Sequence, residues 1–88
     1  MNQDKIKGQL KQEGYTEIYL WKDPPHKVYT PHSHNTETKL IVMKGEIEIT
    51  ANNMKKTYHL RDSIIIPKRG KHSAIVGPEG CEYLIGEK

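Results

Sequence analysis

The sequence predicts an all-β fold, a small antiparallel β-barrel or sandwich with at most one short N-terminal helix. Most of the chain consists of short runs rich in Ile, Val, Tyr and Thr, separated by Pro, Gly and Asn. Runs of this kind with turn residues between them are typical of the strands of barrels and sandwiches. The expected strands are residues 15–21, 26–30, 38–45, 46–50, 56–60, 63–67, 72–77 and 81–87.

Helical spacing occurs only in the opening segment. Ile6 and Leu10 are four residues apart, Asp4 is a candidate N-cap and Gly14 is a candidate stop. One short helix is therefore expected before the strands.

The length of 88 residues predicts a single domain that spans residues 1–88, without a linker or repeat. The pair Asn52-Asn53 tolerates positive φ and predicts a hairpin between the strands on either side of it. So small a domain has a thin core, and an oligomer interface or a bound metal would add to its stability.

The charge of the chain is weakly basic, with a formal net charge of +3 and a pI of about 9.0. Basic patches attract phosphates, but the clustered Lys and Arg residues fall in expected turns without aromatic residues to stack on bases. We therefore expect no nucleic-acid partner.

The single cysteine, Cys81, cannot form an internal disulfide, and no apolar stretch resembles a membrane span or a signal sequence. These features predict a cytoplasmic protein without a membrane partner. Cys81 has no neighbouring histidine in the sequence, so a nucleophilic role is not expected.

Two histidines one residue apart, His32 and His34, are the first candidates for chemistry. Side chains two apart on a strand point to the same face, so the pair is a candidate metal chelate. If both face the interior, strand alternation predicts that Val28 and Thr30 do so too.

The next strand gives an interior row of Thr38, Leu40 and Val42 by the same alternation. Ile41 and Met43 then point outward, and apolar residues on an outer face need cover. A second sheet or a second subunit would supply it, and we therefore expect a homodimer.

The chain resembles the cupins in two stretches. "TPHSHNTETKLIVMKG" looks like their first motif, with His32, His34 and Gly45 in place, and "RDSIIIPKRGKHSAIV" looks like their second, with Pro67 and His72 in place. The resemblance covers residues 27–76 and implies a cupin barrel there, a double-stranded β-helix of jelly-roll type. It also implies that His72 joins His32 and His34 as a metal ligand.

Several motif positions depart from the family pattern, and most of these departures alter turns. They are His26 and Arg61 in place of leading glycines, Gly70 one place late, and Val76 in place of asparagine.

The departure with a chemical consequence is the acid, because Thr38 stands where the family has a metal-binding Glu and Glu37 is one residue off. In a regular strand Glu37 points outward and water completes the metal shell, whereas a β-bulge would turn Glu37 inward. The unbroken row of Thr38, Leu40 and Val42 favours the regular strand.

Three imidazoles suit a divalent transition metal: Zn, Ni, Fe, Cu, Co or Mn. Three ligands leave coordination positions for water or substrate, as in catalytic zinc sites. The pocket wall is expected to consist of Val28, Thr38, Leu40 and Val42.

Other candidates have simpler interpretations. His26 and His59 are expected to be ordinary surface or core histidines. Trp21, Tyr15 and Tyr19 could line a ligand cleft, but aromatic residues of a small β-protein are more often found in the core or at an interface, where we expect them. No inward Asp or Glu can be assigned as a general base.

The cupin resemblance implies a metal-binding protein that holds a small molecule in its barrel. One hypothesis is a metal-dependent enzyme of the dioxygenase or isomerase type. The alternative is a non-catalytic sensor or binding cupin, and the third is a metal-free barrel with the histidines in a polar core.

Overall fold

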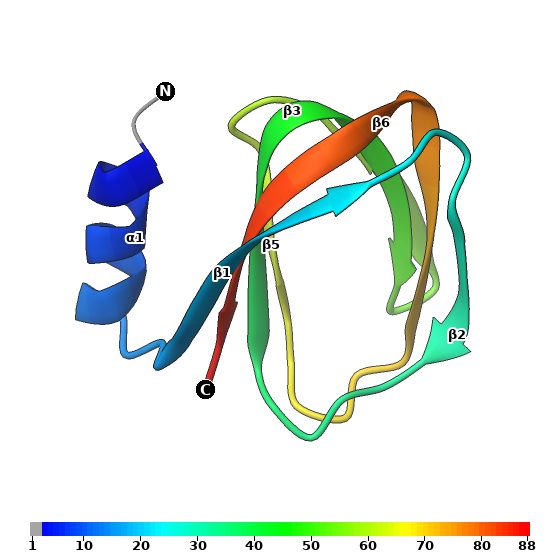
Figure 1. The fold of residues 1–88 in the computed structure, drawn as a ribbon. Coiled ribbons are helices and arrows are strands. Elements are labelled where there is room, and N and C mark those ends of the chain that lie inside the picture. The colour runs from blue at the N-terminus through cyan, green and yellow to red at the C-terminus, as the bar shows by residue number, and fades with distance from the viewer. Residues whose placement is uncertain (1–2) are drawn as a thin grey trace.

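The computed structural model describes residues 3–88, which form one helix and six strands in a single antiparallel sheet curled into a barrel (Figure 1). The all-β prediction with one short helix is confirmed. The elements are α1 (Gln3–Gln12), β1 (Glu17–Asp23), β2 (Val28–His32), β3 (Thr38–Ala51), β4 (Met54–Tyr58), β5 (Ser63–Ile66) and β6 (His72–Glu87).

Two long strands form the frame of the barrel. β6 pairs with β1, β2 and β3, while β3 pairs with β4, β5 and β6. The sequence predicted four separate strands here, residues 38–45, 46–50, 72–77 and 81–87, and the structure joins them into two continuous ones.

A glycine pair explains why these strands bend without ending. Gly45 has φ of 76° and Gly80 has φ of 80°, and the register of the two strands shifts between Gly45 and Ile47. A Cβ at Gly45 would collide with the carbonyl oxygen of Gly80. Only glycine fits at position 45. Figure 1 shows that both long strands, β3 and β6, curve strongly along their length.

The hairpin predicted at Asn52-Asn53 is present. Both residues have positive φ, 53° and 62°, and Ala51 pairs with Met54 across them. Two positive-φ residues between paired strands make the turn that matches strand twist.

The interior of the barrel holds the main hydrophobic core. Inward side chains of β3, β4 and β6 form it, as strand alternation requires. Its buried members are Val42, Ile47, Ile49, Tyr58, Ala74, Val76, Cys81, Tyr83 and Ile85.

Helix α1 covers the outer face of the sheet. Ile6 and Leu10 are buried against Leu84, and Ile41 and Met43 pack against the same cluster. The outward apolar residues of β3 are therefore covered within the chain. They required no second sheet or subunit, and sequence alternation could not indicate that the helix folds back onto them.

No helix among residues 3–88 is long and apolar enough to cross a membrane.

Candidate metal centre

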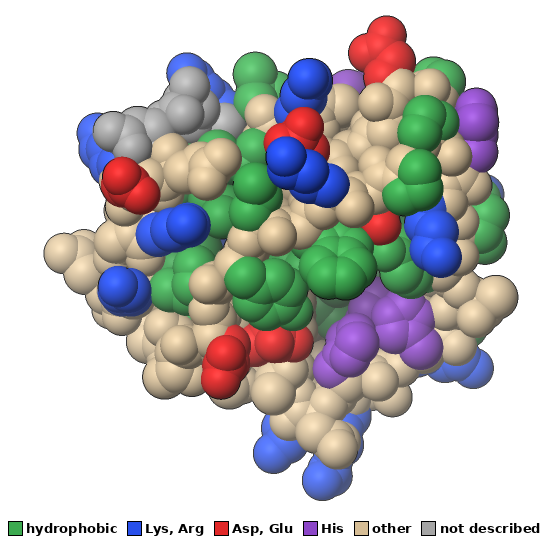
Figure 2. Space-filling view, viewed as in Figure 1, with side chains coloured by type: hydrophobic (Ala, Val, Ile, Leu, Met, Phe, Trp, Pro, Cys, Tyr) green, Lys and Arg blue, Asp and Glu red, His purple; other side chains and the backbone are tan. Residues whose placement is uncertain are grey.

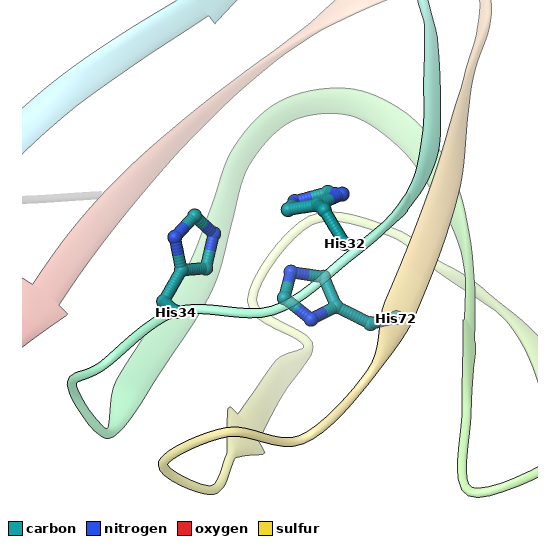
Figure 3. Close-up of side chains that lie close together, drawn as sticks. All are labelled: His32, His34 and His72. Atoms are coloured by element: carbon teal, nitrogen blue, oxygen red, sulfur yellow. The ribbon is translucent and has the colours of Figure 1, made fainter.

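Three histidines converge at one end of the barrel (Figure 3). His32 ends β2, His34 lies in the following loop, and His72 begins β6 opposite His32. The ring centroids of His32 and His72 are 4.2 Å apart, and those of His34 lie 5.0 and 5.2 Å from them. One nitrogen from each ring lies within 4.8 Å of the others. The spacing suits three ligands of one ion.

Backbone carbonyls orient two of the rings. Nδ1 of His32 lies 2.6 Å from the carbonyl oxygen of Thr30, and Nδ1 of His72 lies 2.9 Å from that of Gly70. A carbonyl oxygen only accepts, so each Nδ1 must carry the proton. The neutral ring then has its lone pair on Nε2, the usual arrangement for a metal-binding histidine.

The loop between β5 and β6 supports His34. The Arg69 amide donates a 2.8 Å hydrogen bond to the carbonyl of His34, and Arg69 itself has a φ of 65°. The Gly70 amide bonds to the carbonyl of Pro67 at 2.9 Å. This tight turn leads directly to His72, and its hydrogen bond to His34 holds the two histidine-bearing segments together.

The surroundings of His72 favour its neutral form. Burial lowers the pKa of His72 from its ordinary value of 6.5, the neighbouring His32 and His34 lower it further, and the Gly70 carbonyl partly opposes them. A neutral imidazole is the form that binds a metal.

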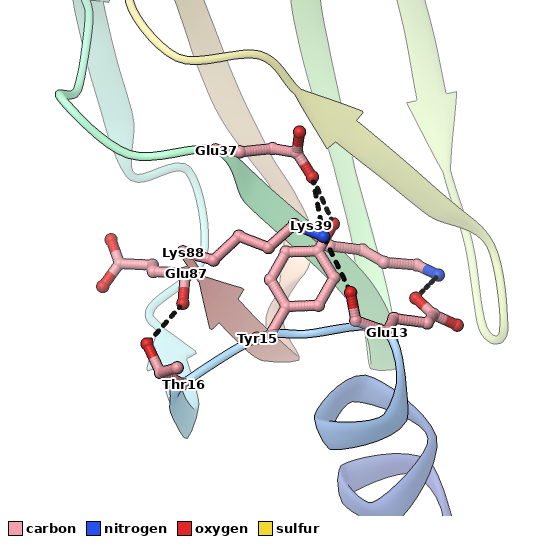
Figure 4. Close-up of polar contacts among 7 residues, drawn as sticks. All are labelled: Glu13, Tyr15, Thr16, Glu37, Lys39, Glu87 and Lys88. Carbon is pink, nitrogen blue, oxygen red and sulfur yellow. Dashed lines mark hydrogen bonds and ion pairs between the residues drawn. The ribbon is translucent and has the colours of Figure 1, made fainter.

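Glu37 points away from the histidines. Its carboxylate accepts a 2.9 Å hydrogen bond from the Tyr15 hydroxyl and lies 3.7 Å from Nζ of Lys88 (Figure 4). The backbones of Glu37 and Lys88 also exchange hydrogen bonds of 2.9 and 3.0 Å. The chain thus adopts the regular strand rather than a bulge that would turn Glu37 inward.

Thr38 faces the interior in its place. Its side chain is 6% exposed and lines the same cavity as the histidines. Its hydroxyl oxygen is buried and has no hydrogen-bond partner among the described residues. Buried hydroxyls are normally paired, so this orphan beside three imidazoles fits a ligand or metal-bound water.

The histidines open into a cavity of about 210 Å³. In Figure 2 the histidine side chains gather beside hydrophobic side chains at a hollow. The lining residues are Tyr19, Trp21, Tyr29, His32, His34, Thr38, Leu40, Ile47, Ile49, Ile66, His72, Ala74, Tyr83, Ile85 and Glu87.

The structure places only part of the expected pocket wall at the cavity. Thr38 and Leu40 line the cavity, whereas Val42 is buried in the barrel core and lies outside the lining. Val28 is 57% exposed and Thr30 is exposed as well, so the predicted interior placement of both residues was wrong. The register of β2 shifts between Tyr29 and His32, which breaks the alternation and puts Tyr29 inside instead.

Sequence reasoning missed a buried acid. Asp23 is 8% exposed and accepts a 3.0 Å hydrogen bond from the Trp21 indole as well as bonds from the Tyr29 and Tyr83 hydroxyls. Burial, followed by this carboxylate, raises the pKa of Tyr83. Alternation along residues 19, 21 and 23 could have placed Asp23 inward.

The other histidines lie apart from the cluster. His59 is exposed near Glu46 and Asp62, at 3.9 and 3.8 Å, and exposed His26 occupies a turn with φ of 64°. Neither belongs to the group of close metal-binding nitrogens.

The fold and site define a small β-barrel protein with a histidine-lined cavity. The chain belongs to the cupins, because the family model described as "Cupin domain" matches residues 19–85. The comparison with curated proteins gives no match.

Several solved structures resemble the barrel. A cupin-2 domain protein of Shewanella frigidimarina is 27% identical with a TM-score of 0.68, over 80% of this chain and 67% of that one. KdgF of a Halomonas species is 21% identical with a TM-score of 0.70, over 80% and 67%.

The DMSP lyase DddQ of Ruegeria pomeroyi is 18% identical with a TM-score of 0.75, over 81% of this chain and 36% of that one. The chain thus spans about a third of DddQ. The likeness to KdgF and DddQ concerns the fold alone.

Proposed function

We propose that the protein binds one divalent transition metal through His32, His34 and His72 and holds a small molecule beside it. The observation that carries this proposal is the convergence of three imidazole nitrogens within 4.8 Å at the wall of a cavity. The candidate metals are Zn, Ni, Fe, Cu, Co and Mn, all of which accept imidazole.

The chemistry of the surrounding residues supports this assignment. A bound metal would act as a Lewis acid toward an oxygen of the small molecule. His32 and His72 keep Nδ1 on backbone carbonyls, and the unpaired Thr38 hydroxyl can donate to or accept from the ligand. Leu40 and Ile85 supply apolar wall.

Within this function, the finer proposal is an enzyme of the dioxygenase or isomerase type. A specific observation favours the non-catalytic alternative, a sensor or binding cupin: the carboxylates near the cavity, Asp23 and Glu87, both accept hydrogen bonds from aromatic side chains. These donors stabilise the ionised carboxylates and make each a weaker base than a carboxylate without such donors.

Titration of metal-stripped, untagged protein with Co²⁺ tests the metal site. We expect visible absorption that saturates at one equivalent, because imidazole ligation changes the ligand field of the ion. His34→Ala should abolish it, while His59→Ala, which removes a histidine outside the cluster, should leave it unchanged. Equal loss in both variants, or no saturable absorption in the unmodified protein, would contradict the proposal.

A further inference from the structure

One wall of the cavity is aromatic, and its polar groups share a single arrangement. Four aromatic side chains other than histidine line the cavity, and each donates its polar hydrogen to a carboxylate. Three share Asp23 as the acceptor, and the fourth bonds to Glu87 at 3.4 Å. They are Trp21, Tyr29 and Tyr83 on Asp23, and Tyr19 on Glu87.

These bonds determine what the wall offers a ligand. A phenol or indole that donates to an anion gains electron density in its ring, and its only donor is already occupied. What remains for a ligand is the ring faces, whose quadrupole attracts cations, and the lone pairs of the tyrosine oxygens, which only accept. Trp21 is 47% exposed and Tyr19 is 37% exposed, so a ligand can reach both.

The charges around the cavity also favour a cationic ligand. The chain contains 14 Lys and Arg residues, yet none of them is among the residues that line this cavity. Glu87 lines it, and Asp23 lies buried behind the rings. Lys27 Nζ lies 5.5 Å from the Tyr29 ring centroid, but Lys27 is outside the lining and does not fill the cavity.

We propose that this aromatic wall is a binding subsite for an organic cation of the alkylated ammonium class. A metal on the three histidines would repel a simple cation, so the complete ligand carries an anionic oxygen at its other end. This requirement rests on the proposed function. The ligand is then a small zwitterion, with its cation on the rings and its oxygen toward His32, His34 and His72.

The single tryptophan of the chain, Trp21, reports on this subsite. We would titrate metal-free protein with choline and with its neutral carbon isostere, 3,3-dimethylbutan-1-ol, and follow Trp21 fluorescence. Choline should give a saturable change and bind about fivefold or more tightly than the isostere, in line with the strength of cation–π contacts. Equal binding of the two probes, or no saturable change with choline, would overturn the proposal.

Two variants that each remove one negative charge test whether choline binds at this cavity. Glu87→Gln should weaken choline binding about two- to fivefold, as expected for loss of a nearby negative charge, while an amide oxygen can still accept from the Tyr19 hydroxyl. Glu82→Gln removes the same charge from another residue of β6, one that lies outside the cavity lining, and should leave binding unchanged. Equal weakening by both would show a general charge effect and overturn the subsite.

The two proposals fail separately. Choline binding is measured without metal, so a chain that binds no metal can still support the cation subsite. Co²⁺ absorption reports on the histidines and does not require the aromatic wall.

Discussion

The Tyr15 hydroxyl donates a 2.9 Å hydrogen bond to Oε2 of Glu37 on the outside of the barrel. Thr38, the next residue, is buried in the cavity on the other side of the strand. Adjacent residues of a strand point to opposite faces. Because Glu37 is held outside, Thr38 must face the cavity. The position where the cupins have an acid therefore presents a neutral hydroxyl.

Replacing Thr38 by valine should not destabilise the metal-free protein. Its buried hydroxyl has no partner in the described chain, so the change should be neutral or stabilise the fold by up to about 1 kcal/mol. Urea unfolding of stripped wild-type and Thr38→Val protein measures this difference. A loss of more than about 1 kcal/mol would mean that the hydroxyl has a partner without metal.

The strand positions and the pairing of His32 with His34 were predictable from local sequence. Alternation and turn residues gave the strands, and the spacing of His32 and His34 placed them together. His72 came from the cupin resemblance, because no local pattern connects it to residues forty positions earlier.

The errors arose where the chain departs from regular alternation or folds back on itself. The register shift in β2 put Tyr29 rather than Val28 inside. The return of α1 over Ile41 and Met43 is a long-range contact that strand patterns do not encode. Asp23 was missed although alternation along β1 puts it on the same face as Trp21. What the local pattern could not indicate is that Tyr29 and Tyr83, from other strands, donate to its carboxylate.

The packing of α1 on the sheet should be a main source of stability. Leu10 is 1% exposed in the cluster with Leu84, so Leu10→Ala should lower the free energy of unfolding by about 2–5 kcal/mol. The exposed neighbour Lys11→Ala should change it by less than about 0.5 kcal/mol. Chemical denaturation measures both, and equal small effects would show that the helix contributes little.

Acidification should destabilise the metal-free protein through His72. Its folded-state pKa is lowered below 6.5 by burial, so below about pH 6.5 the unfolded chain binds a proton that the folded chain resists. The thermal midpoint should therefore fall as the pH drops below that value. His72→Gln should reduce this slope, and an unchanged slope in the variant would assign the pH dependence to other groups.

The homodimer is still a prediction, although Ile41 and Met43 no longer support it. Its support is the exposed apolar pair Val28 and Ile75, which are register partners on β2 and β6 and are 57% and 49% exposed. Light scattering should give twice the chain mass of 10.2 kDa, and Ile75→Lys should reduce it to the single chain. A wild-type mass of one chain at micromolar concentration would contradict the dimer.

Metal content of purified protein without a histidine tag tests the central claim most directly. We expect one equivalent of a divalent transition metal in the wild type and nearly the same in Glu37→Gln, since Glu37 is bonded to Tyr15 outside the cavity. His72→Ala should lose most of the metal, because it removes one of the three convergent imidazoles. A metal-free wild type would contradict the metal centre, and loss in Glu37→Gln as complete as in His72→Ala would show that Glu37, not water, completes the shell.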